Sequence, residues 1–402
     1  MRMIRAVAIM LTLTVTITLV GCVSYVDLSD RAIVQAIGID YLPDKKVYRI
    51  SVQYFNQSSE GGQNQIDKTQ DNVLKSVGEG ESIFAAAKNA SMLTGKDLLL
   101  SENRLIIIGK ELRKYKLGDT LEFFVGNYHS HPQAYVAAAE DTAEELLDIR
   151  FKEGSTSSQR LADLIRNASV ESRCKSTYPY QVMTMLCTST ESAFLPLLTT
   201  ATLKTDVTIP KETGGGKGNG GGEEQSEDGE KTIILDGGVV FKGGKELCKV
   251  DDDGATAIFF MNDMPSEYSF TVPLGQNAMP SVTLIEVTRS IKATEYNGKV
   301  KFDVTFSASG KIGSKGGIKE DEKKAAEKVA EPAERELKRK IENSVIPIAK
   351  KGCDVFGLEN TLRRCCNGFY RENKDRVGEI IAESEIEVNV NIDIFSQGIG
   401  GA

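Results

Sequence analysis

Hydrophobic and polar residues alternate along several stretches of the chain, which predicts β-strands because successive strand side chains point to opposite faces. Residues 47–55 show this most clearly, and one face of that stretch carries Tyr48, Ile50, Val52 and Tyr54. The same alternation runs through 282–295, 299–309 and the C-terminal stretch 386–394. Asn297-Gly298 between the first two is a strong signal for a hairpin turn. Shorter apolar runs predict further strands at 32–41, 104–109, 134–139, 233–241, 246–250 and 255–261.

Capping residues mark the helices that separate these strands. Ser82 is a suitable N-cap and Gly95 a suitable terminator for a helix over 82–93. Thr142 and Glu145 form a capping box that begins a helix ending near Leu147. Further helices are predicted near 117–125, 157–169, 181–187 and 360–370. Helices mixed with antiparallel hairpins predict an α+β fold of several domains, with mixed or antiparallel sheets and packed helices.

Residues 321–351 have helical periodicity interrupted by two prolines. Pro332 fits the first turn of a helix, and Pro347 must kink or end one. A narrow apolar stripe with spacings of four and three residues runs along this segment: Leu337, Ile341, Val345 and Ile348. Because lysines and glutamates are mixed over the rest of the surface, we expect the stripe to pack against the hairpin sheet and not against a membrane.

The first 21 residues have the layout of an export signal. Arg2 and Arg5 precede an apolar run over 6–20, which is too short for an ordinary transmembrane helix. The motif Leu19-Val20-Gly21-Cys22 resembles the bacterial lipobox, in which the cysteine is acylated and becomes the mature N-terminus. Two acyl chains on Cys22 would give stable membrane anchoring. The alternative is an uncleaved signal with an incidental cysteine.

Charge and cysteine usage narrow the possible partners. Removal of Arg2 and Arg5 with the signal changes the formal net charge from −8 to −10. An acidic chain without a Lys/Arg block is poorly suited to nucleic acid or to holding itself on anionic lipid, so the acyl chains must provide the attachment. The other cysteines are scattered without a Cys-x-x-Cys pair, and we expect mostly free, buried thiols: Cys174, Cys187, Cys248, Cys353, Cys365 and Cys366.

A polar segment divides the chain. Residues 211–231 contain a glycine run followed by acidic residues and have nothing to bury, so we interpret them as a flexible linker. A phosphate-binding loop is excluded because Lys217 is followed by Gly218 and no hydroxyl follows. The predicted organisation is a cleaved signal at 1–21, an N-terminal α/β domain at 22–210, the linker at 211–231, a small β-rich middle domain at 232–280, and a hairpin-helix-strand domain at 281–402.

Reactive groups are scarce. His129 and His131 are two residues apart, but no third metal ligand is identifiable by spacing. Any nucleophile-base pair that uses histidine would have to use one of these two. Asp251-Asp252-Asp253-Gly254 lacks the spaced ligands of a calcium loop. We therefore predict no catalytic, cofactor-binding or metal-binding residue, no enzymatic activity, and one modification site, the lipidation of Cys22.

Ordered motifs resemble the spore germination lipoproteins of the Ger(x)C type. They are Gly21-Cys22, Gly38-Ile39-Asp40, the segment 80–86, the segment 104–112, the segment 237–247, the turn 353–358 and the terminal alternating strand that ends before Gly398. The sequence departs from the family pattern at Val23-Ser24, where Trp-Asp is usual, and at Glu359, where a glycine is usual.

The resemblance implies a non-catalytic C subunit of a germinant receptor, required for nutrient-triggered spore germination. Acylated Cys22 would tether it to the outer face of the spore inner membrane, where it would dock on A-type and B-type membrane subunits. An alternative is an exported lipoprotein that binds a small ligand alone, in a cleft between domains. A third is a cell-surface hydrolase with a deep pocket around His129 or His131.

Limited proteolysis tests the linker. We expect the first cuts between Gly214 and Lys231, because no side chain there gains enough by burial to offset the entropy of ordering. Mass spectrometry of the early fragments identifies the cut sites. Protection of this stretch together with early cleavage elsewhere would contradict the boundary.

Overall fold

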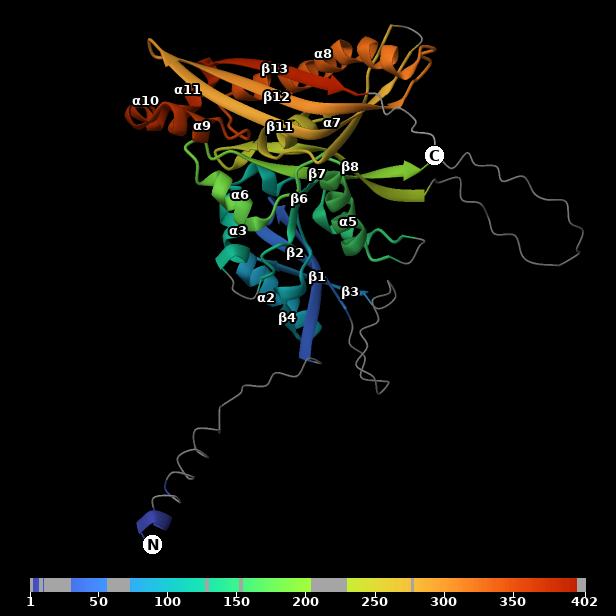
Figure 1. Ribbon diagram of the computed structural model, residues 1–402. Helices are drawn as coiled ribbons and strands as arrows, with labels where there is room; N and C mark the ends of the chain where they lie inside the picture. The colour runs from blue at the N-terminus through green and yellow to red at the C-terminus, as the bar shows by residue number, and fades with distance from the viewer. Residues whose placement is uncertain are drawn as a thin grey trace, which may run out of the picture.

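The structure is a computed structural model that describes residues 3–6, 10, 30–55, 73–126, 130–151, 155–203, 230–275 and 278–395. Two β-sheets lie one above the other in Figure 1, with helices on both faces of the larger sheet and helices beside the smaller one. The predicted lipidation site Cys22 and His129 lie outside the described residues.

The first sheet has nine strands in the order β3-β2-β1-β5-β6-β7-β8-β9, with β4 paired to the start of β1. Strands β1, β5, β6 and β7 are parallel to one another, β4 pairs parallel with β1, and β2, β3, β8 and β9 pair antiparallel. The strand bounds are β1 (Arg31–Leu42), β2 (Val47–Phe55), β3 (Val73–Gly80), β4 (Asp97–Leu99), β5 (Leu105–Ile108), β6 (Tyr135–Ala139), β7 (Ala193–Leu203), β8 (Glu230–Lys242) and β9 (Lys245–Val250).

Helices cover both faces of the first sheet. On one face lie α2 (Ile83–Thr94), α3 (Leu117–Gly126) and α6 (Pro179–Leu186), and on the other lie α4 (Ala143–Asp148) and α5 (Ser157–Val170). The predicted caps of α2 are confirmed, since Ser82 accepts a hydrogen bond from the Ala85 N–H at 3.1 Å and Gly95 is left-handed at φ 66°. Short 3₁₀ helices occur at η3 (Leu100–Glu102), η4 (Leu112–Lys114) and η5 (Lys374–Arg376).

The second sheet has the order β10-β11-β12-β13, formed by β10 (Glu267–Thr271), β11 (Ser281–Tyr296), β12 (Lys299–Ser314) and β13 (Glu385–Ile394). The predicted hairpin at Asn297-Gly298 is confirmed, and both residues have positive φ. Strand β13 pairs parallel with β12, so the chain between them must cross over the sheet. The crossover contains α8 (Glu322–Ala349), α9 (Leu358–Cys365), α10 (Asn367–Glu372) and α11 (Val377–Glu383).

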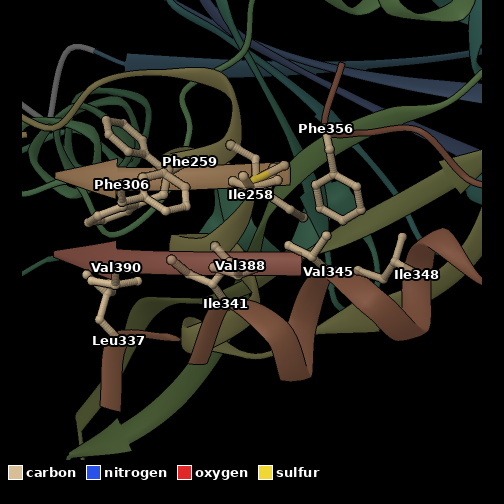
Figure 2. Close-up of a cluster of buried hydrophobic side chains, with 14 of the residues drawn as sticks. Ile258, Phe259, Phe306, Leu337, Ile341, Val345, Ile348, Phe356, Val388 and Val390 are labelled. Atoms are coloured by element: carbon tan, nitrogen blue, oxygen red, sulfur yellow. The ribbon is translucent and has the colours of Figure 1, made fainter. Parts of the chain in front are cut away.

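Helix α8 packs on the second sheet through the predicted stripe. Its four stripe residues are at most 4% exposed, and Figure 2 shows Leu337 and Ile341 beside Val388 and Val390 of β13. The prediction of a helix start at Pro332 is wrong, because α8 continues through this proline. Packing of the helix against the sheet outweighs the missing backbone hydrogen bond. The helix also continues through Pro347 and ends two residues later, at Ala349.

Helix α7 (Asp252–Asn262) replaces the strand predicted at 255–261. Every residue from Gly254 to Met261 is buried, and Figure 1 shows the helix between the two sheets. A short apolar run without periodicity cannot distinguish a buried helix from a buried strand. The distinguishing signal is at its start, where the Asp251 side chain accepts a hydrogen bond from the Gly254 N–H at 2.9 Å. The acidic run 251–253 is thus a helix start, favoured there by the helix dipole.

The strand pairing does not give residues 232–280 a sheet of their own. Strands β8 and β9 extend the first sheet, and β10 belongs to the second. The reason is that β7 and β8 form a long antiparallel pair, which places β8 at the end of the parallel strands. Residues 204–229, which include most of the predicted linker, lie outside the described residues. The division into domains therefore stays a prediction.

Two further expectations differ in detail. The helix predicted at 360–370 is divided at Cys366, which has φ −129° and ψ 53°. All six cysteines after Cys22 are free, but only Cys174 and Cys353 are buried.

In the part of the chain that the structure describes, no helix is long and apolar enough to span a membrane.

A charge on the packed face of β13 tests the core. The side chain of Val390 packs against α8, and the residue is 8% exposed. Val390→Asp therefore buries an unpaired carboxylate and should lower the free energy of unfolding by about 3–5 kcal/mol. The matched control is Asn391→Asp, which adds the same carboxylate at the next, exposed position and should change it by less than about 0.5 kcal/mol. Urea unfolding followed by circular dichroism measures both. Equal midpoints for the two variants would contradict the packing of this face.

Candidate functional site

His131 lies in a turn and takes no part in a reactive cluster of the described residues. Its Nδ1 accepts a hydrogen bond from the Gln133 N–H at 3.1 Å, and the backbone N–H of His131 donates to the carbonyl of Leu100. Within the described ranges, no group of three His, Cys, Asp or Glu side chains is arranged to hold a metal ion. His129 lies outside them, so the structure does not place the two histidines together.

A cleft of about 420 Å³ lies between the last strand of the first sheet and α8. It is lined by β9, the start of α7 and the second half of α8, and its charged residues are Lys249, Asp251, Asp253, Arg339, Lys340 and Lys351. The sequence analysis expected the ligand site of a free-standing binding protein in a cleft between domains, without naming its residues.

Most charges in this cleft already have protein partners. Lys340 Nζ lies 2.7 Å from Asp253 Oδ1, and Lys249 Nζ lies 2.5 Å from Glu140 Oε1. Asp251 caps α7. A polar solute would therefore have to compete with ion pairs that connect α7 to α8 and β9 to the loop after β6.

A buried hydrogen-bond cluster joins the second sheet's helices to the first sheet. The Glu359 carboxylate in α9 is 6% exposed and accepts hydrogen bonds from the Ser189 N–H at 3.0 Å and the Ser189 hydroxyl at 2.7 Å. The Tyr370 hydroxyl donates to the same carboxylate at 3.0 Å. Ser189 lies just before β7, so these hydrogen bonds join two segments whose residues are 170 positions apart in the sequence. We call this cluster the Glu359 joint.

Asp354 supports the joint from the turn before α9. Its carboxylate accepts hydrogen bonds from the N–H groups of Phe356, Leu358 and Glu359, and its own N–H donates to Ser192 Oγ at 3.0 Å. Burial raises the pKa of Asp354, although the three N–H donors favour the ionised form. The carboxylate therefore holds the turn to the start of α9, and the bond to Ser192 joins the turn to the residue before β7.

The buried thiols nearby are unreactive. Burial raises the pKa of Cys353 to about 12, and its thiol donates to the carbonyl of Phe241. Burial also raises the pKa of Cys174. Because the thiolate is the nucleophile, neither cysteine is prepared for covalent chemistry.

Sequence reasoning missed the Glu359 joint, although one signal pointed to it. Glu359 departs from the glycine usual in the resembling family, and a carboxylate in a turn that packs between elements needs donors. Its partner Ser189 gives no local signal, because the contact is made only by folding. The described residues thus define a two-sheet α+β protein with a structural polar joint and a polar cleft.

Two family profiles match the chain in order. The Spore germination protein N-terminal domain matches residues 24–200, and the Spore germination B3/GerAC-like C-terminal domain matches residues 236–398. Together they cover most of the chain, and the chain belongs to this Ger(x)C-type family of spore germination proteins.

One curated protein and one solved structure are similar to this chain. Spore germination protein KC of Bacillus subtilis (strain 168) is 24% identical over 405 residues, covering 98% of this chain and 95% of that protein. The fold is similar to the crystal structure of the GerBC protein, with a TM-score of 0.51 and 13% identity over 89% of this chain and 96% of that one. The predicted α+β fold is therefore confirmed.

Removal of the Glu359 carboxylate tests the joint. Glu359→Ala leaves the buried Tyr370 hydroxyl without its acceptor and removes two hydrogen bonds from the exposed residue Ser189, so the free energy of unfolding should fall by about 1–3 kcal/mol. Amide hydrogen exchange over 187–192 should become faster. The control Glu372→Ala removes an exposed carboxylate on neighbouring α10 and should leave both quantities unchanged. Unchanged exchange at 187–192 in Glu359→Ala would show that the joint does not hold this segment.

Proposed function

We propose that this protein is a non-catalytic, membrane-anchored lipoprotein subunit of a spore germinant receptor complex, required for nutrient-triggered germination. Acylated Cys22 attaches it to the outer face of the spore inner membrane. There it docks on the A-type and B-type membrane subunits of the receptor. The observation that carries this proposal is the position of the lipobox relative to the family match.

The family match begins at residue 24, two residues after Cys22. A signal that is cut before Cys22 therefore removes nothing that the family shares and leaves the acylated cysteine at the start of the matched region. Each buried acyl methylene contributes about 0.8 kcal/mol, so two acyl chains are sufficient for stable attachment. This position supports an anchor at Cys22, immediately before the region that the family shares.

The described residues support a role without catalysis. The buried thiol of Cys353 has a raised pKa, and the buried carboxylates of Glu359 and Asp354 are occupied by structural hydrogen bonds. A protein that acts through surfaces needs a rigid arrangement of its parts, which the joint provides.

The cleft between β9 and α8 gives the small-ligand-binding alternative a definite location. An exported lipoprotein that binds a small polar solute alone would use this space of about 420 Å³. Copurification of the acylated chain from spore membranes separates the two functions. Recovery with polytopic membrane subunits supports the receptor role. Recovery alone, with saturable binding of a germinant by calorimetry, supports the alternative.

Loss of the anchor tests the proposal directly. Cys22→Ala removes the acylation site, so the protein should leave the membrane fraction of cells that lack the partner subunits, and the mass of two acyl chains should be absent. Cys187→Ala is the matched control, since it removes an exposed free cysteine elsewhere and should leave the chain in the membrane fraction.

Two results would contradict the anchor. One is quantitative retention of the Cys22→Ala chain in those membranes. The other is an unmodified Cys22 in the mature protein with the parent sequence, as read by mass spectrometry.

A further inference from the structure

Helix α2 exposes three large apolar side chains. Phe84, Met92 and Leu93 are 66%, 71% and 74% exposed. Phe84, Lys88 and Met92 are spaced by four residues and therefore lie in one row along the helix. Single exposed apolar residues are ordinary, but a group of them marks a contact site. Leu93 is nine residues from Phe84 and therefore points to the opposite side of the helix, but it lies next to Met92 at the C-terminal end. We call Lys88, Met92 and Leu93 the α2 face.

Strand β3 extends this apolar surface at the C-terminal end of the helix. The Ser76 hydroxyl donates to the carbonyl of Ala90 at 2.8 Å, and Gly78 lies directly against Ala86 and Ala90. Leu74 is on the same side of β3 as Ser76 and Gly78, so it lies toward the C-terminal end of α2. It is 40% exposed there.

A groove of about 180 Å³ runs beside the α2 face. Strands β1 and β2 form its floor, and helices α2 and α3 form its walls, with Phe123 and Phe124 on the α3 side. Among the described residues that line it, Lys88 alone is charged. An apolar groove with an ammonium group at its rim fits an acyl chain joined to a phosphate.

The α2 face lies at the end of the first sheet where the chain enters the fold. Asp97 of β4 pairs with Arg31 at the start of β1, and Leu93 precedes Asp97 by four residues. Figure 1 shows α2 and β4 near the start of β1, at the end of the molecule away from the second sheet. Asp30 follows Cys22 by only eight positions, a span of at most ~28 Å. Acyl chains on Cys22 therefore hold this end close to the bilayer.

The charges of this segment suit an anionic bilayer. Residues 83–96 contain Lys88 and Lys96 and no carboxylate, although the whole chain has a net charge of −8. Neither lysine forms an ion pair with any residue that the structure describes. Residues 56–72, which connect β2 to β3 at the same end, contain one large apolar residue, Ile66, and so offer little apolar surface to cover the α2 face.

We propose that the α2 face is a bilayer-contact surface. Met92 and Leu93 enter the boundary between headgroups and acyl chains, and Lys88 and Lys96 contact lipid phosphates. The inference rests on the proposed anchor at Cys22: the acyl chains hold the protein, and the α2 face fixes its orientation. Tethering raises the local concentration of the face at the bilayer, so a weak contact is sufficient.

The absence of tryptophan from the chain allows a background-free test. Met92→Trp places a single indole on the α2 face. The acylated variant is bound to vesicles of phosphatidylglycerol and phosphatidylethanolamine, with or without bromine in the acyl chains. We expect brominated lipid to remove about half of the emission, since an interfacial helix buries its apolar side by roughly 5–10 Å. Leu93→Trp is a second reporter that should behave alike.

Two matched controls place the indole elsewhere on the surface. Val170→Trp lies at the end of α5 on the opposite face of the first sheet, and Tyr296→Trp lies at the β11–β12 turn. Both positions are exposed, and their emission should be the same on both kinds of vesicle.

Each outcome decides between the possibilities. Vesicle-bound Met92→Trp and Leu93→Trp with emission unaffected by bromine would overturn the bilayer contact while leaving the anchor intact. An emission shift that appears only when the receptor's membrane subunits are present would assign the α2 face to a protein partner and reject the proposal. A chain that lacks acyl groups by mass spectrometry and does not float with vesicles would contradict the anchor, and with it this inference.

Discussion

Burial of helix α7 between the two sheets is the constraint on which the rest of the structure depends. Phe260 of α7 contacts Tyr268 and Phe306 of the second sheet, with ring centroids 5.1 and 5.8 Å apart, while Phe194 and Val240 of the first sheet belong to the same core. Each large apolar side chain buried there contributes about 1.5–3 kcal/mol. Separation of the sheets would expose several of them at once, so the two sheets form one packed unit.

Apolar packing brings the sheets together, and polar contacts fix how they lie. The Glu359 joint and the backbone hydrogen bonds of Asp354 have defined directions, because buried carboxylates need donors at short distance. They act at the α9 end of the interface, whereas the ion pair of Lys340 with Asp253 acts at the α8 side. Together these contacts hold the second sheet in a fixed orientation relative to the first.

This rigidity bears on the proposed receptor role. With an anchor at Cys22, the first sheet stands at the membrane and the second sheet is held away from it (Figure 1). Contacts made by either sheet with membrane subunits would then be transmitted through α7 and the Glu359 joint. The family's ordered motifs lie on both sides of this interface, in agreement with a protein that acts as a whole.

The sequence by itself determined the local elements: the caps of α2, the hairpin at Asn297-Gly298, and the apolar faces of α8 and β13. Each depends on side chains a few residues apart, which periodicity and capping rules describe. Only the tertiary structure decided that 252–262 is a helix, that α8 continues through Pro332, and that Glu359 meets Ser189. Strands β3, β7 and β10 also escaped prediction. Helix α7 and the contact of Glu359 with Ser189 depend on partners that are distant in sequence and meet only when the two sheets pack. Strands β3 and β10 pair with the neighbouring strands β2 and β11, so strand pairing selects their conformation and not a local pattern in the sequence.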